Sequence, residues 1–153
     1  MVPVVEEGTR KGVSPLHPLL AHDFKKRERA AMTAPQLLRR LDAIEGFLEL
    51  GDAKEALRLL LEIPEWVRLK DCQLLQTHLK VLLTQKDWAA ASELARCLVG
   101  AFPSNAEAWY GLAVADLNAG AVETAKEALR KACELNSDLK LRALSDHNLT
   151  ALW

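Results

Sequence analysis

The fold is decided by residues 88–135, which read WAAASELARCLVGAFPSNAEAWYGLAVADLNAGAVETAKEALRKACEL. Leu and Ala, both strong helix formers, supply most of the apolar residues here. Pro103-Ser104-Asn105 and Gly120 interrupt the stretch, because proline and glycine disfavour the interior of a helix. The sequence therefore predicts three helices, over 88–101, 106–118 and 122–135.

The same pattern of helix-breaking and helix-capping residues extends towards the N-terminus, where two more units of helix, tight turn and helix are predicted. Proline and glycine end helices, and short polar side chains cap the free backbone amides at a helix start. In the first unit, Thr33 and Gln36 form a capping-box pair before a helix to about Leu50, Gly51-Asp52 forms a turn, and a second helix over 53–63 ends at Pro64. In the second unit, Asp71 caps the first helix and Lys86-Asp87 forms the turn.

These turns recur at a fixed interval. Gly51, Lys86 and Gly120 are separated by 35 and 34 residues, and the alanines at 56, 91 and 125 show the same two intervals. A period near 34 residues in helix pairs is typical of the tetratricopeptide repeat. The third unit carries the resemblance most clearly. It has Trp109, Leu112, Gly120, Ala125, Leu129 and Ala132 in the order and spacing of that family, and departs from it at Ala113, Asp116 and Ser137.

The resemblance implies an all-α fold, a right-handed α-solenoid of three helix pairs with a C-terminal helical cap. The repeats would span 35–70, 72–105 and 106–137, and the cap 138–153. Two helices approach closely only where the contact residue is small, so Ala113, Ala125 and Ala132 are expected at helix crossings. The bulkier Trp109 and Leu129 would fill the spaces between crossings.

The predicted cap has its own pattern. Residues 141–153 read LRALSDHNLTALW, which resembles the endings of a group of bacterial tetratricopeptide-like proteins. Ser137 is expected to cap a short helix, and Ser145 or Asp146 a last turn. This resemblance concerns the fold and implies no activity.

Composition narrows the classes of function. The net charge is −1, so the chain as a whole does not attract nucleic acid or an anionic membrane surface. No apolar run has the length of a membrane span, and no signal peptide is expected, because the first residues lack a charged region followed by a long apolar stretch. Three cysteines with no CxxC pair indicate free, mostly buried thiols in a reducing cytoplasm. A flexible tail over 1–17, a helix over 18–32 and the repeat domain over 33–153 are expected.

The sequence contains no pattern typical of catalysis. It lacks the phosphate-binding, dinucleotide-binding and nucleophile-elbow motifs. No pair among His17, His22, His78 and His147 has metal-ligand spacing, and His78 takes a core-facing position of the second unit. The chain is therefore expected not to be an enzyme and to need neither metal nor cofactor.

Binding to another protein is the function that the resemblance implies. In the family the first helix of each unit lines a concave surface that takes a peptide or a helix of a partner. Tyr110 is expected to face this surface as an anchor, and Trp109 to fill the interior. The concave-face residues are Tyr110, Val114, Leu117, Asn118 and Glu107 from the third unit, Gln73, Gln76, Lys80, Leu83 and Thr84 from the second, and Leu38, Leu41, Glu45, Leu48 and Glu49 from the first.

Several alternatives stay open from the sequence. Leu38, Leu41 and Leu48 would instead pack beneath a preceding helix if the helix over 18–32 covers them. An adaptor or scaffold for an unidentified protein is the favoured function. A dedicated secretion chaperone and a homo-oligomer that assembles through Trp153 and the repeat edges are the alternatives.

Overall fold

The structure is a computed structural model that describes residues 32–153. Residues Ala34–Trp153 form one compact unit. Every regular element in the described residues is helical: α3 (Ala34–Glu49), α4 (Ala53–Leu61), α5 (Glu65–Arg68), α6 (Cys72–Thr84), α7 (Trp88–Ala101), α8 (Ala106–Asn118), α9 (Val122–Leu135), α10 (Leu139–Ser145) and the 3-10 helix η2 (His147–Leu152). The tail predicted over 1–17 and nearly all of the helix predicted over 18–32 lie outside the described residues.

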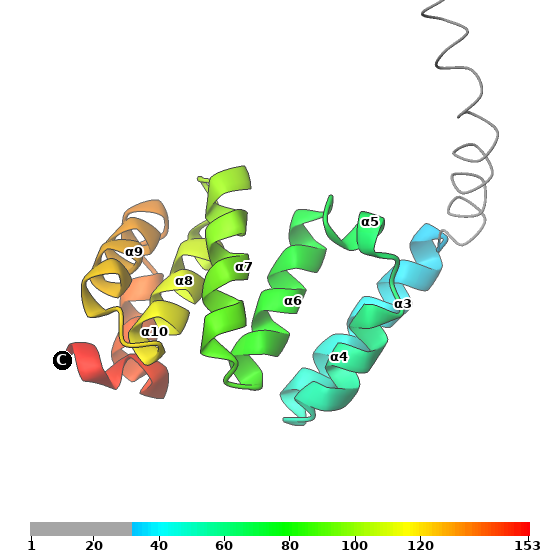
Figure 1. The fold of residues 1–153 in the computed structure, drawn as a ribbon, viewed down its shortest axis with the longest axis horizontal. Helices are drawn as coiled ribbons and strands as arrows, with labels where there is room; N and C mark the ends of the chain where they lie inside the picture. Colours follow the sequence, from blue (N-terminus) through cyan, green and yellow to red (C-terminus); the bar gives the residue numbers. More distant parts are fainter. Residues whose placement is uncertain (1–31) are drawn as a thin grey trace, which may run out of the picture. The chain divides into compact units, whose positions relative to one another are not determined.

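The helices pack mainly against their neighbours in the chain. α3 packs against α4, α6 against α7, α7 against α8, and α8 against α9. Contacts also join α3 to α6 and α6 to α8, so the first helices of successive pairs form a row. Figure 1 shows α6, α7, α8 and α9 following one another across the domain. The prediction of an all-α domain of stacked, sequentially packed helices is confirmed.

Three turns share one backbone geometry. Gly51, Lys86 and Gly120 have positive φ angles of 79°, 60° and 94°. At each turn the next amide donates to the carbonyl five positions back: Asp52 to Phe47, Asp87 to Leu82, and Ala121 to Asp116, at 2.8, 3.0 and 2.8 Å. This is the Schellman ending of a helix, which favours glycine at the positive-φ position. The 35- and 34-residue intervals of the sequence are thus repeated in the backbone.

Capping side chains fix where most helices begin. Asp71 accepts hydrogen bonds from the amides of Gln73 and Leu74, and Asp87 accepts from Ala90. Asn105 caps α8 in the same way. Since these signals are local, the bounds of α7, α8 and α9 agree with the prediction residue for residue.

The structure corrects the predicted elements at two places. α4 ends at Leu61, and after Pro64 the chain forms the four-residue helix α5, which the sequence analysis missed. A single turn is too short to show a helical period, and proline favours the first turn of a helix. Asp138, not Ser137, precedes α10, and its side chain makes no capping bond. The Asp146 cap of the last turn is confirmed, with its carboxylate accepting from the amide of Asn148.

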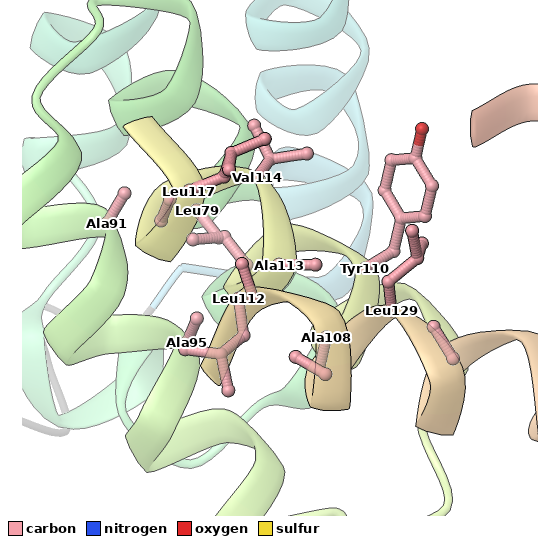
Figure 2. Close-up of a cluster of buried hydrophobic side chains, with 14 of the residues drawn as sticks. Leu79, Ala91, Ala95, Ala108, Tyr110, Leu112, Ala113, Val114, Leu117 and Leu129 are labelled. Atoms are coloured by element: carbon pink, nitrogen blue, oxygen red, sulfur yellow. The ribbon is translucent and has the colours of Figure 1, made fainter. Parts of the chain in front are cut away.

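The core centres on α8. Of its residues Ala108–Leu117, all except the half-buried Trp109 are buried. Figure 2 shows part of this cluster, in which Ala95 from α7 lies near Leu112 of α8. The predicted crossing residues Ala113, Ala125 and Ala132 are fully buried, as small residues at close helix contacts should be.

Trp109 differs from its prediction. Its ring is only half-buried against the core, and its indole N–H donates to the carbonyl of Pro103 at 2.8 Å.

The cysteine thiols were predicted to be free and mostly buried, and they match this prediction only in part. All three are free, but Cys97 is exposed, while Cys72 and Cys133 are half-buried. His78 is half-buried rather than in the core.

One carboxylate is buried in this helical core. Asp116 of α8 is 1% exposed and accepts hydrogen bonds from Ser92 Oγ at 2.5 Å and from Arg96 Nη2 at 3.3 Å, both from α7. A buried charge is tolerated only when it is paired and hydrogen-bonded. These contacts join α7 to α8.

Candidate binding groove

A groove with a cavity volume of about 690 Å³ runs along the row of first helices. α3, α6 and α8 supply three of its sides, and the C-terminal segment after α9 supplies the fourth. The lining residues are Glu45, Leu48 and Glu49 from α3; Gln76, Leu79, Lys80, Leu83 and Thr84 from α6; Glu107, Tyr110, Gly111 and Val114 from α8; and Arg142, Asp146 and Asn148 from the C-terminal segment.

The apolar floor of the groove lies where α6 meets α8. Leu79 and Leu83 of α6 and Val114 of α8 contribute aliphatic surface there. A glycine permits this approach: a Cβ at Gly111 would lie 2.5 Å from Leu79 Cδ2 and 3.7 Å from Leu83 Cδ1. Because Gly111 has no side chain, Leu79 and Leu83 of α6 can pack directly against the backbone of α8.

The C-terminal segment is fixed to α8 by polar contacts at this groove. The hydroxyl of Tyr110 donates to Asp146 Oδ2 at 2.7 Å, and the side-chain amide of Asn118 donates to the backbone carbonyl of Asn148 at 3.0 Å. Arg142 donates to both carboxylate oxygens of Glu107, at 3.0 and 2.8 Å. Its guanidinium also lies 4.4 Å from the centre of the Tyr110 ring, within cation–π range. Sequence analysis predicted the cap but not its part in the groove.

Tyr110 was predicted to face the groove, but in the structure it belongs to the core as well. It lines the groove, but only 2% of its surface is exposed, and it belongs to the core cluster. Figure 2 places its ring at the margin of that cluster, with the hydroxyl pointing away from the other labelled side chains. Burial, with the hydrogen bond to Asp146, raises the pKa of this phenol far above its ordinary value. Replacing Tyr110 with Ala should therefore cost stability, which would not be expected of a side chain that only faced the groove.

The predicted concave residues divide into two sets. The larger set lines one groove and consists of Glu45, Gln76, Lys80, Leu83, Tyr110 and Val114, together with Leu48, Glu49, Thr84 and Glu107. Val114 is buried there, with 3% of its surface exposed. The smaller set does not line the groove and consists of Gln73, Leu41, Leu117, Asn118 and Leu38. Leu41 and Leu117 are core residues, Leu38 is 59% exposed, and Asn118 donates to Val114 and Asn148.

The charges on the lining are unevenly distributed. Four carboxylates (Glu45, Glu49, Glu107 and Asp146) and two cations (Lys80 and Arg142) give a formal balance of −2. Arg142 is held by Glu107, whereas Lys80 lies 3.7 Å from Glu45. The α3 side is therefore the acidic side of the groove.

Other kinds of site were sought in the same residues. Across residues 32–153, no three His, Cys, Asp or Glu side chains gather into a set that could hold a metal ion. Within that range, too, no helix combines the length and apolar character that crossing a bilayer requires. No protein-family model matches the chain, and no curated protein matches it significantly.

Proposed function

We propose that this chain is a protein-interaction module, an adaptor or scaffold that binds a peptide or a helix of a partner protein in the groove. The observation that carries the proposal is the groove itself, about 690 Å³ in volume, with an apolar floor and a charged rim. Protein interfaces have this arrangement, because buried apolar contacts supply affinity and the polar rim supplies specificity.

The arrangement of the walls of the groove favours an elongated ligand. Three helices and the C-terminal segment border it, and the half-buried Leu48 and Leu83 offer apolar contacts on two of these helices. An amphipathic helix or an extended segment could place one apolar side chain near each of them. The buried Tyr110 supports the floor through its ring and the cap through its hydroxyl.

The finer architecture belongs to the same proposal. We infer a right-handed solenoid of three tetratricopeptide-type helix pairs, α3–α4, α6–α7 and α8–α9, closed by α10 and η2. The sequential packing and the three equivalent Schellman turns support it. The free thiols fit a cytoplasmic setting, which is also part of the proposal.

A matched pair of variants tests the function. Leu83 and Leu94 are both half-buried leucines packed against the core, but only Leu83 lines the groove. Truncating either to Ala should cost a similar amount of stability, whereas only Leu83→Ala removes a groove contact. Affinity capture from the native source, quantified by mass spectrometry, should lose its partner with Leu83→Ala and keep it with Leu94→Ala. Equal capture by both variants would contradict binding in the groove.

Self-association is a second candidate function, favoured by one observation. Leu141, Leu144 and Trp153 at the C-terminal end are 75%, 63% and 65% exposed. Large apolar side chains that stay exposed often mark an interface. Size-exclusion chromatography with light scattering should give a dimer or larger species that Leu141→Lys returns to monomer. A monomeric wild-type chain would eliminate this candidate.

A further inference from the structure

The charges of the groove indicate what kind of partner it takes. Arg142 is already paired, because it donates to both oxygens of Glu107 and stacks on the Tyr110 ring. Both oxygens of Asp146 are also occupied, one by the Tyr110 hydroxyl and the other by the amide of Asn148. The C-terminal side of the groove therefore has its charges satisfied internally.

The α3 side is different. Glu45 and Glu49 lie four positions apart on α3, so their carboxylates are on the same face of the helix. Both are exposed and both line the groove. Lys80 approaches Glu45 only to 3.7 Å, longer than a hydrogen bond, and Glu49 has no ion pair with any residue the structure describes. Of these two carboxylates beside the apolar floor, Glu45 is therefore only loosely paired, and Glu49 is not paired with any cation among the described residues.

We propose that the partner segment is basic and amphipathic: its apolar face lies on Leu48 and Leu83, and a Lys or Arg beside that face pairs with Glu45 and Glu49. This inference rests on the proposed function and specifies its ligand. Charge complementarity carries it, because the unsatisfied charge of the groove is negative and lies along one side. An acidic segment or a nucleic-acid backbone would instead place like charges opposite each other.

A cation brought to this position has favourable geometry. A Lys or Arg that reaches between Glu45 and Glu49 meets two acceptors one helical turn apart, and an arginine fork can donate to both. The α3 wall also sets a direction. Basic side chains should face α3, and the opposite edge of the segment should be neutral, because Arg142 and Glu107 already satisfy each other there.

The experiment is a selection from a random peptide library displayed on phage, carried out on the full chain. Peptides count as groove ligands when Leu83→Ala weakens them and Leu94→Ala does not. The proposal expects these ligands to be enriched in Lys and Arg flanking apolar residues. Groove ligands that are neutral or acidic would overturn the basic partner while leaving the groove function in place. Recovery of no groove ligand would overturn the proposed function and this inference with it.

Charge variants then locate the contact on α3. Glu45→Gln with Glu49→Gln should weaken a selected peptide roughly five- to twentyfold, because each exposed ion pair contributes no more than a few-fold. The matched control is Glu123→Gln with Glu127→Gln, an exposed pair at the same spacing on α9 in which Glu123 also faces a lysine, at 3.4 Å. Fluorescence anisotropy of the labelled peptide measures both. A basic peptide that binds the α3 variant as tightly as the control would overturn the assignment to Glu45 and Glu49.

Discussion

The hydroxyl of Tyr110 donates a hydrogen bond of 2.7 Å to Asp146, which lies 36 positions later in the chain. This bond joins the most buried helix of the domain to the segment that forms the fourth side of the groove. The shape of the groove consequently depends on a contact that also belongs to the core. Binding and stability are coupled at Tyr110, whereas Leu83 contributes to the groove from a half-buried position.

The Tyr110 phenol should titrate abnormally, and its signal can be read directly because it is the only tyrosine of the chain. Burial and the adjacent Asp146 carboxylate raise its pKa. A pKa raised on folding favours the native state below about pH 10, the ordinary value, and this contribution is lost as the pH rises towards the folded value. Phenolate absorbance should be absent at pH 10.5 in the native chain and present in urea.

The same titration has an internal control. Asp146→Asn removes the negative charge but keeps an oxygen that can accept the hydroxyl proton, so the native pKa of Tyr110 should move down towards its ordinary value. Ionisation of native wild-type Tyr110 near pH 10 would show that the bond to Asp146 does not form in solution.

Lys86 occupies the one turn of the three that lacks glycine at the positive-φ position. A non-glycine residue in this conformation costs roughly 1–2 kcal/mol. Lys86→Gly should therefore raise the free energy of unfolding by about 0.5–1 kcal/mol, once the greater freedom of unfolded glycine is subtracted. Lys54→Gly, within α4, should lower it by a similar amount. Urea unfolding measures both, and a destabilised Lys86→Gly variant would contradict the left-handed turn.

The buried Asp116 should be needed for stability even though no catalytic role is assigned to it. Asp116→Ala leaves the Ser92 hydroxyl without its acceptor and opens space between α7 and α8. We expect a loss of about 2–3 kcal/mol, because hydrogen bonds to a buried charge are among the stronger ones. Arg96→Gln should cost less than about 1 kcal/mol, since the Arg96 side chain is 58% exposed. Equal losses would mean that the ion pair, and not the bond to Ser92, stabilises this contact.

His78 should make the domain sensitive to mild acid. Burial lowers the pKa of its ring, and nearby Arg68 lowers it further. The unfolded ring takes up a proton near pH 6.5, before the folded ring does, so stability should fall as the pH drops through and below that value. The melting temperature should decrease between pH 7.5 and 5.5, and His78→Gln should reduce the decrease. His147→Gln, at an exposed ring, should not, and an unchanged slope in His78→Gln would contradict the prediction.

The sequence was sufficient where structure depends on local signals. Asp87, Asn105 and Gly120 act within a few residues of the helix ends that they mark, so α7, α8 and α9 could be predicted to the residue. The four-residue α5 could not be predicted, because its length is below one helical period. The family resemblance predicted four of the five α6 residues that line the groove, namely Gln76, Lys80, Leu83 and Thr84. It missed Leu79 and included Gln73, which does not line the groove.

The burial of Tyr110 could not be predicted in the same way. α8 is covered by α6, α7, α9 and η2, and nearly its whole circumference is apolar, so its sequence has no polar face to distinguish groove from core. The fourth side of the groove depends on contacts between residues 30–36 positions apart, such as Asn118 with Asn148. Such pairs follow from the path of the chain after α9, which no local pattern encodes.

Site-specific photo-cross-linking tests the groove as the binding site most directly. A photoreactive amino acid replaces exposed Thr84, which lines the groove, or exposed Glu93 on α7, which does not. Each full-length variant is expressed in the native source and irradiated, and its adducts are identified by mass spectrometry. We predict a discrete adduct with one partner protein from position 84 and none from position 93. The same partner cross-linked equally from both positions, or from position 93 alone, would contradict the account.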